Sequence, residues 1–450
     1  MPISPVLERQ TTYPFVRLNE AAKRVEARGV RVIDFGTGDP REATDPLIRE
    51  ALVAGLRDRM GYPSSAGLPE LREAVAAWAR RRFGADLDPE TEIVPTLGSK
   101  EAIFSFAQVV VDLERGKDTV AYTEPGYPVY ERGALFAHAR RLPLPLREEH
   151  GFLPDLDAID DETWSRLAVL WVNYPNNPTG AIAPLTFYRD LAERARERGF
   201  VLASDEAYTE LWFEEPPASA LQLDDLTNVA VFNTLSKRSS MTGYRSGFVA
   251  GDAALIGALK AFRPTVGTAP QEFVQRASVV AWGDEAHVER TRELYGRKRA
   301  LFLDLFGRKG LRVAGSDATM YLWLAVPAGE TSEGFAERLL EHGILVAPGS
   351  YLGEAGEGYF RLALVPSEEE CARAVEILED VLPQGAHIDA LLAAEPESGA
   401  NLLLKLDHIS MSGAPGKAEA ARAFLARVDE SSPQQRDSAA QVREWLKTQP

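Results

Sequence analysis

The chain has 450 residues, which is enough for one large domain or for two to three smaller ones. It is 45% hydrophobic, ample for a sizeable core, and its net charge of −17 argues against nonspecific binding to nucleic acid or to an anionic membrane. The single cysteine, Cys371, allows no intrachain disulfide, and the first residues contain no apolar signal segment. These features predict a reducing compartment, the cytoplasm, and no membrane association.

Helical and strand patterns alternate through the middle of the chain. Helical spacing of apolar residues occurs at 75–85, 102–114 and 190–199. Apolar runs of strand length occur at 119–125, 167–175, 200–208, 229–237 and 247–252. Short apolar strands separated by helices predict an α/β fold, with a mostly parallel sheet covered by helices on both faces.

The C-terminal part of the chain has a different pattern. A long amphipathic helical region spans 271–308, and strands are expected in 311–327, 343–353 and 359–366 before a closing helix at 367–382. We therefore expect an N-terminal arm with part of a small domain (1–44), a large domain (45–300), the rest of a small α+β domain (301–383) and an extension of unknown role (384–450). The extension contains linker-like stretches.

One motif in the long helical region is discounted. DEAH at 284–287 spells a helicase box, but the sequence contains no GxxxxGK[ST] phosphate loop. We expect these residues to form a solvated helix face. The six histidines show no metal-ligand spacing, so no metal is expected.

Polar and aromatic residues follow the predicted strands, at the edge where open α/β sheets bind ligands. Taken singly, Asp205 could cap a helix, Asn177 could belong to a turn and Tyr127 could belong to the core. Their convergence on one sheet edge is a stronger indication of a binding site. The residues at this edge are Lys237, Asp205 with Tyr208, Asn177 in PNNPTG, Tyr127 in PGYPVY, and Gly98 with Ser99, which open a helix in TLGSKEA.

This set of groups indicates the chemistry of the ligand. A lysine amine forms a Schiff base with a carbonyl, and a carboxylate pairs with a protonated pyridine nitrogen. An amide and a phenol can hydrogen-bond an aromatic hydroxyl oxygen, while a second aromatic stacks on the ring. Helix-start N–H groups, hydroxyls and an arginine bind a phosphate. Pyridoxal phosphate has all of these groups, and no other common cofactor uses them all.

The ordered motifs carry a family resemblance over roughly residues 12 to 383. They are GTGDP, YPSSAGLPELR, TLGSKEA, EPGYPVY, NYPNNPTG, SDEAY, SKRSSMTGYRSG and YFRLAL. With these motifs, the chain resembles the fold-type I pyridoxal-phosphate enzymes, specifically the class I/II aminotransferases. The long C-terminal extension departs from the compact pattern of that family.

The resemblance implies a role for each cofactor-site residue. Lys237 binds the cofactor covalently and moves the substrate proton, and Asp205 keeps the ring nitrogen protonated. Asn177 and Tyr208 bind the ring hydroxyl oxygen, and Tyr127 stacks on the ring. The phosphate is held by backbone N–H groups of Gly98, Ser99 and Lys100, by Thr234, Ser236 and Arg245, and by Tyr62 from the neighbouring subunit of a homodimer.

The resemblance also implies how the substrate binds. Arg361 grips the substrate α-carboxylate bidentately, with Asn177 and Gly38 beside it. Arg41 and Arg238 are candidates for a second acidic group, although a structural or solvent-facing role is the simpler interpretation of each. The partners implied are small amino and keto acids, with neither nucleic acid nor membrane.

The implied function is ping-pong amino transfer. The stretch SKRSSMTGYRSGFVAGD is most similar to succinyldiaminopimelate aminotransferases of lysine biosynthesis, whose typical donor is glutamate. Alternatives are another class I aminotransferase, for aromatic, aspartate or LL-diaminopimelate substrates, and a fold-type I pyridoxal-phosphate lyase. A noncatalytic aminotransferase-like regulator is disfavoured, because Lys237 is intact and few residues precede the fold.

Overall fold

The computed structural model describes residues 3–8, 14–327 and 329–382, with isolated positions between 422 and 447. The extension expected at 384–450 therefore lies almost wholly outside the described residues. The chain divides into two compact units. The first unit contains 1–12, 39–295 and 317–321, and the second contains 13–38, 296–316 and 322–450. The four-part division expected from the sequence stays a prediction.

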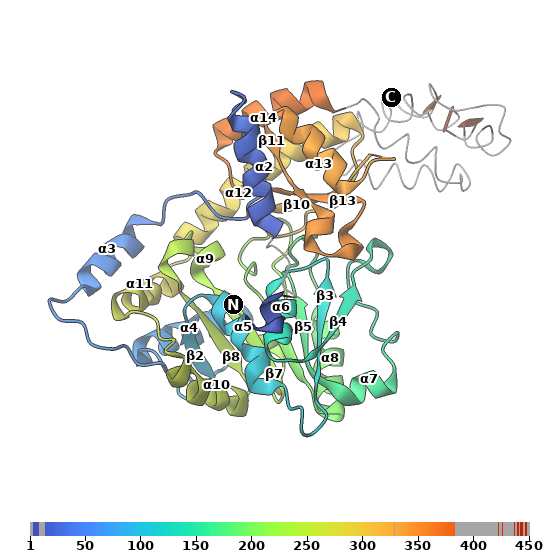
Figure 1. Ribbon diagram of the computed structural model, residues 1–450. Coiled ribbons are helices and arrows are strands. Elements are labelled where there is room, and N and C mark those ends of the chain that lie inside the picture. The colour runs from blue at the N-terminus through green and yellow to red at the C-terminus, as the bar shows by residue number, and fades with distance from the viewer. Residues whose placement is uncertain are drawn as a thin grey trace. The chain divides into compact units, whose positions relative to one another are not determined.

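A seven-stranded sheet forms the centre of the first unit (Figure 1). Its strand order is β2-β8-β7-β6-β5-β3-β4. Strand β8 runs antiparallel to both of its neighbours, and the remaining pairs are parallel, so the predicted mostly parallel sheet is confirmed. The strands are β2 (Ile93–Thr96), β3 (Thr119–Glu124), β4 (Arg140–Pro145), β5 (Leu167–Asn173), β6 (Val201–Asp205), β7 (Val229–Thr234) and β8 (Gly247–Gly251).

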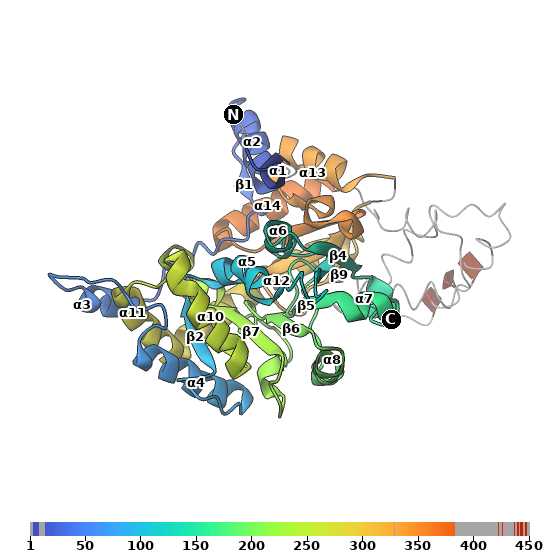
Figure 2. The same cartoon turned by 60° about the horizontal axis from the view of Figure 1, so that its bottom comes forward.

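Helices cover both faces of this sheet (Figure 2). Helices α5, α6 and α10 pack on one face, and α4, α8 and α11 pack on the other. The helices that begin in the first unit are α1 (Pro5–Glu8), α3 (Pro46–Gly55), α4 (Pro69–Phe83), α5 (Ser99–Val110), α6 (Val129–Phe136), α7 (Asp161–Arg166), α8 (Leu185–Arg198), α9 (Leu235–Arg238), α10 (Ala253–Val266), α11 (Glu272–Gly283) and α12 (Ala286–Lys309).

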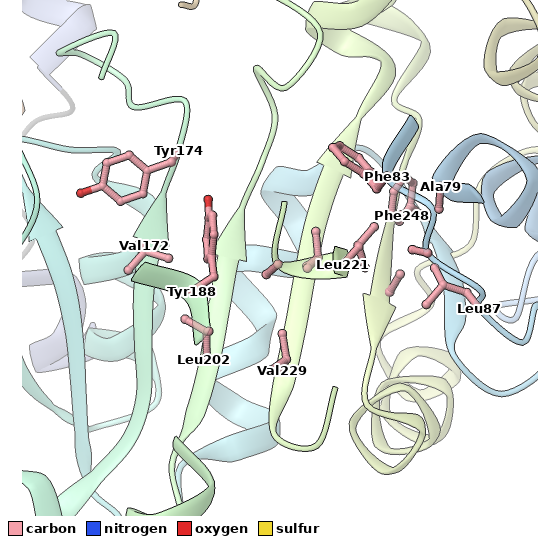
Figure 3. Packing of buried hydrophobic residues seen from close by; sticks show 14 of the residues in the cluster. Ala79, Phe83, Leu87, Val172, Tyr174, Tyr188, Leu202, Leu221, Val229 and Phe248 are labelled. Carbon is pink, nitrogen blue, oxygen red and sulfur yellow. The ribbon is translucent and has the colours of Figure 1, made fainter. Parts of the chain in front are cut away.

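The strands alternate their side chains between two hydrophobic clusters. In β5, Val172 joins the cluster under α4 and α8, whereas Trp171 joins the cluster under α5 and α6. Successive strand residues point to opposite faces, so a strand covered on both sides is apolar throughout. Figure 3 shows part of the first cluster, with Tyr188 of α8 beside Val172 and Leu202. This packing fixes the strands whose ends carry the predicted site residues.

The helical region predicted at 271–308 is interrupted. The structure has two helices there, α11 and α12, because Asp284 takes an extended conformation with φ −106° and ψ 125°. Its carboxylate accepts a hydrogen bond from the backbone N–H of His287 at 3.0 Å, in the first turn of α12. The DEAH residues lie at this break, and His287 is buried, so the prediction of a solvated face is wrong for His287.

The second unit has two small sheets. Strand β1 pairs in parallel with β11, and the other sheet has the order β12-β13-β10-β9. Cys371 is buried in α14, as expected for a structural thiol. The strands are β1 (Ile33–Asp34), β9 (Val313–Gly315), β10 (Tyr321–Ala325), β11 (Ile344–Leu345), β12 (Ala347–Pro348) and β13 (Tyr359–Ala363), and the helices are α2 (Pro14–Glu26), α13 (Ser332–Glu341) and α14 (Glu368–Val381).

Candidate active site

The strand register brings the predicted cofactor residues of the first unit to one sheet edge. The last residue of β5, Asn173, pairs with Asp205, the last residue of β6. Further along the strand order, Gly247 at the start of β8 pairs with both Thr96, which ends β2, and Thr234, which ends β7. The loops that follow these strand ends therefore begin side by side.

Asp205 is a buried carboxylate with two donors. Its Oδ2 accepts a hydrogen bond from the Tyr130 hydroxyl at 2.7 Å, and its Oδ1 accepts one from the Ala207 N–H at 3.3 Å. Burial raises the pKa of Asp205 to about 6, against the lowering effect of the Tyr130 bond. A buried anion of this kind is stabilised by a cationic partner. The protonated ring nitrogen of pyridoxal phosphate is such a partner.

Tyr130 lies in the same motif as Tyr127 but was not singled out from the sequence. Its ring stacks on Trp171 with centroids 5.0 Å apart and an interplanar angle of 17°. Tyr127, three residues earlier, meets Tyr130 edge to face at 5.8 Å and is itself only half-buried. The motif thus supplies two tyrosines with different surroundings. Tyr130 orients the Asp205 carboxylate, and Tyr127 has a ring that is partly exposed.

The Asn177 loop is tied to the end of β6 by another residue that the sequence did not single out. Asn173 donates from its amide to the Asp205 carbonyl at 2.7 Å, and its Oδ1 accepts from the Asn177 N–H at 2.8 Å. Beyond Asp205, the Tyr208 hydroxyl is hydrogen-bonded to that of Tyr321 at 2.8 Å. Asn173 and Tyr321 thus position the two predicted partners of the ring hydroxyl.

The loop before α5 leaves space that a side chain would fill. Gly98 is the N-cap of α5 with φ +74°, and a Cβ there would lie 2.5 Å from Nη2 of Arg245. The Arg245 guanidinium donates to the carbonyls of Thr242 at 2.7 Å and Leu97 at 3.2 Å. The glycine therefore allows the arginine to approach the N-terminus of a helix, where backbone N–H groups favour an anion.

Three cations gather around this helix start. The pKa of the Lys100 ammonium is lowered by burial and further by the charges of Arg245 and Lys237. Mutual repulsion of this kind is relieved when an anion binds between the cations. A phosphate group meets that requirement in both charge and hydrogen-bonding capacity.

The two hydroxyls predicted at the phosphate have local partners. Thr234 is the N-cap of α9, and its Oγ1 accepts from the Ser236 N–H at 3.1 Å. The same hydroxyl is 2.9 Å from both the Ser246 carbonyl and Oγ of Ser236. Thr234 thus fixes the turn that carries Lys237.

Arg238, a candidate for a second acidic substrate group, has a structural role. It is 1% exposed, and it donates to the carbonyl of Ala281 at 2.5 Å and to Oε2 of Glu285 at 2.8 Å. Its guanidinium also lies 5.1 Å from the centre of the Trp282 ring. These contacts hold α9 against the junction of α11 and α12. Arg41, the other candidate, is exposed.

The predicted carboxylate-binding residues lie in the second unit. Arg361 in β13 is 2% exposed and donates from Nη2 to the Gly36 carbonyl at 2.7 Å. The Phe35 carbonyl accepts from the N–H of Ala363 at 2.8 Å, so the segment that leads to Gly38 runs along β13. Tyr62, in contrast, lies in the first unit and is fully exposed.

The first-unit residues fit pyridoxal phosphate. The buried carboxylate suits its ring nitrogen, the glycine-lined helix start with three cations suits its phosphate, and the lysine amine suits its aldehyde. Within the described ranges, no cluster of three or more histidine, cysteine or acidic side chains is arranged to hold a metal ion. Nor does any helix in the described part of the chain have both the length and the apolar character to cross a membrane.

Comparison with known proteins gives the same indication. Residues 30–378 match the family model "Aminotransferase class I and II". The chain is 40% identical over 375 residues to the LL-diaminopimelate aminotransferase of Aquifex aeolicus, which covers 82% of this chain and 96% of the relative.

Two solved structures are similar to the fold. An aminotransferase from Neisseria meningitidis has a TM-score of 0.78 and 36% identity, covering 84% of this chain and 99% of that one. A probable N-succinyldiaminopimelate aminotransferase from Thermus thermophilus has a TM-score of 0.76 and 30% identity, covering 82% and 100%. Enzymes of this family depend on pyridoxal phosphate. The chain belongs to the class I and II aminotransferases.

Proposed function

We propose that this aminotransferase moves amino groups between glutamate and a diaminopimelate-type compound, with unacylated LL-diaminopimelate as the preferred substrate. The observation that carries the proposal is the 40% identity with the Aquifex aeolicus LL-diaminopimelate aminotransferase over 96% of its length. The N-succinylated compound is the second candidate. It is supported by the SKRSSMTGYRSG stretch and by the name of the Thermus thermophilus structure.

The proposed chemistry assigns the proton transfers to two side chains. When bound, pyridoxal phosphate supplies a carbonyl that bonds to amines and a ring that withdraws electrons from the substrate Cα. Asp205 holds a proton at the ring nitrogen, which maintains that withdrawal. The amine of Lys237 would hold the cofactor through its aldehyde, and the same amine would serve as the general base and acid that moves the proton of the substrate Cα.

The remaining residues bind and orient. Arg361 receives the substrate α-carboxylate in a bidentate pair, a geometry that the planar guanidinium favours, and Asn177 and Gly38 are the other residues proposed to bind the substrate. Tyr127 stacks on the cofactor ring, and Asn177 and Tyr208 bind its hydroxyl oxygen. The proposed phosphate-binding residues are Gly98, Ser99, Lys100, Thr234, Ser236 and Arg245.

We also propose a homodimer in which Tyr62 binds the cofactor phosphate of the partner subunit. The proposal is supported by full exposure of the Tyr62 side chain and by exposed apolar residues on and after α3. Leu47, Val53 and Leu56 are each about half exposed or more, at 48%, 65% and 51%. Exposed apolar side chains are costly to leave in water, and a second copy of the chain would cover them.

A substrate panel tests the specificity. The purified enzyme is given LL-diaminopimelate, its N-succinyl derivative, aspartate or phenylalanine as donor, with 2-oxoglutarate as acceptor, and glutamate formation is measured. We expect kcat/KM for LL-diaminopimelate to exceed that of every other donor by at least about tenfold, or 1.4 kcal/mol of transition-state binding. A preference for the N-succinyl compound would support the second candidate, and a preference for aspartate or phenylalanine would exclude both.

A variant that lacks the proposed catalytic amine is measured in the same assay. Lys237→Ala should abolish multiple turnover with every donor, because no other amine is assigned to move the proton. Multiple turnover retained by Lys237→Ala would overturn the assignment of Lys237, whatever the substrate preference.

A further inference from the structure

A serine, a histidine and an aspartate form a buried hydrogen-bonded chain behind the turn that carries Lys237. The Ser239 hydroxyl is 2.8 Å from Nε2 of His287, and Nδ1 of His287 is 2.6 Å from Oδ2 of Asp284. Ser239 is 2% exposed and His287 is 5% exposed. Ser239 is two residues after Lys237, whereas the other two residues belong to the α11–α12 junction.

The hydrogen bonds among Ser239, His287 and Asp284 define which of these side chains carries each proton. Burial lowers the pKa of His287 more than its bond to Asp284 raises it, so the imidazole is neutral near pH 7. Although burial alone would raise it, the bonds from His287 lower the pKa of the Asp284 carboxyl below its usual range. An ionised Asp284 can only accept, so Nδ1 of His287 carries the proton and Nε2 accepts from the Ser239 hydroxyl.

This order of residues is that of a nucleophilic triad, but the location does not suit a nucleophile. A serine that attacks a substrate has to be reached by it, and Ser239 is almost wholly covered. The hydrogen bonds among Ser239, His287 and Asp284 therefore serve to hold the backbone at the end of α9.

Helix α9 needs support from outside because it is only four residues long. A single helical turn is unstable by itself, since few backbone hydrogen bonds offset the ordering of its residues. Its N-terminal side is fixed by the Thr234 cap. Its C-terminal side is fixed by Arg238, which binds Ala281 and Glu285, and by Ser239, which binds His287. Lys237 lies between these two anchors.

We propose that His287 is a positioning residue for Lys237, acting through Ser239 and held in its tautomer by Asp284. The inference rests on the proposed role of Lys237 as the amine that binds the cofactor and moves the proton. Movement of the α9 terminus shifts the Lys237 Cα and therefore the point that its amine reaches. Misplacement of a catalytic group by about 1 Å can cost roughly 100-fold in rate.

The experiment uses the holoenzyme and variants that each alter the hydrogen bonds among Ser239, His287 and Asp284. Ser239→Ala removes the donor to Nε2. His287→Asn places its amide near the position of Nδ1 and loses contact with Ser239, whereas His287→Gln places its amide near Nε2 and keeps an acceptor for Ser239. Thr291→Val is the matched control, because it removes the hydroxyl that binds the backbone carbonyl of His287 and leaves the ring untouched.

Four quantities are measured for each variant: kcat and KM with the donor that turns over best, the apparent pKa of the visible absorbance of the lysine-bound cofactor without substrate, and Tm. We expect Ser239→Ala and His287→Asn to lower kcat about tenfold with KM within about twofold, and to shift the absorbance pKa by about half a unit or more. His287→Gln should retain most of kcat and an absorbance pKa near that of the wild type, and Thr291→Val should change neither.

The proposal is overturned if Ser239→Ala has the kcat and absorbance pKa of the wild type. It is also overturned if His287→Gln and His287→Asn lose activity equally with matching losses of Tm, since that would indicate a purely structural role. The absorbance titration contains no substrate, so an error in the proposed specificity does not affect it. A failure of the role of Lys237 would appear separately, as multiple turnover by Lys237→Ala.

Discussion

At the scale of single residues, Asp205 at the end of β6 and Glu206 directly after it have different surroundings, because their side chains point to opposite faces of the sheet. Asp205 accepts from Tyr130 on the α6 side, whereas Glu206 turns to the other face of the sheet. There its Oε1 accepts from the Ser204 hydroxyl and the Ala220 N–H, both at 2.9 Å. Burial raises the pKa of Glu206 to about 7, so about half of this acid keeps its proton in neutral solution, whereas an exposed glutamate would be ionised.

Glu206→Gln should therefore change stability in a pH-dependent way. The pKa of Glu206 rises from 4.5 to about 7 on folding, so its contribution is fully present below pH 4.5 and is lost as pH rises through 7. The loss approaches about 3 kcal/mol, because each pKa unit corresponds to 1.36 kcal/mol. Glutamine has no proton to lose, so the variant should gain stability relative to the wild type between pH 5.5 and pH 8.5.

Thermal unfolding at those two pH values measures the difference. Comparing variant with wild type at each pH cancels the titration of every other group. Glu193→Gln, at an exposed position of α8, is the control and should give the same small difference at both pH values. An equal effect of Glu206→Gln at pH 5.5 and pH 8.5 would contradict the raised pKa of the buried Glu206.

At the scale of elements, the connection between β2 and α5 depends on the close approach of Gly98 and Arg245. Gly98→Ala should weaken cofactor binding, because the new Cβ would lie 2.5 Å from the Arg245 guanidinium and force it away from the helix start. Losing one charge-assisted contact costs about 1.5–3 kcal/mol, so the cofactor Kd should rise at least about tenfold. Titration of the apoprotein with pyridoxal phosphate measures this change.

Gly84 provides a control for the positive φ of Gly98, although its ψ of 10° differs from the 163° of Gly98. It has φ +71°, close to the +74° of Gly98, but a Cβ at Gly84 would meet no atom within 4 Å. Gly84→Ala should therefore cost about 1 kcal/mol of stability through backbone strain and leave the cofactor Kd unchanged. If the two variants changed the cofactor Kd equally, strain alone would explain the result, and the proximity of Arg245 would be irrelevant.

The same elements indicate what the sequence could predict. The strands that end near Asn177, Asp205 and Lys237 were predicted because a buried parallel strand is apolar along its whole length and ends at a polar residue. Their ends lie at one sheet edge because parallel strands share a direction. The positions of these residues thus follow from a local pattern combined with a general rule of α/β folds.

The partners of these residues were not predicted, because each comes from a distant part of the chain. Tyr130 binds an aspartate 75 residues away, and Tyr321 binds a tyrosine 113 residues away. The sequence interpretation places His287 on a solvated face because residues 271–308 are expected to form one long helical region. The break at Asp284 turns it inward instead. Only the three-dimensional packing brings such pairs together.

At the scale of the whole molecule, the exposed segment around α3 leads to a prediction about subunits. If Tyr62 serves the partner's phosphate, each active site in the dimer combines side chains from two chains. Lys237→Ala and Tyr62→Ala then damage different chains of the same site. A mixed dimer of the two variants would contain one site with both substitutions and one site with neither.

Mixing the two inactive or impaired variants should therefore restore activity. At equal amounts, with subunits exchanged by random assortment, half of the dimers are mixed, and each has one intact site, so about a quarter of wild-type activity is expected. The assay is run at limiting cofactor, where loss of the Tyr62 contact has its largest effect, and each variant alone gives the baseline. Mixing either variant with further copies of itself is the control. If Tyr62 instead acts on its own subunit, every site in a mixed dimer lacks either Lys237 or Tyr62. Activity would then stay at the average of the two baselines.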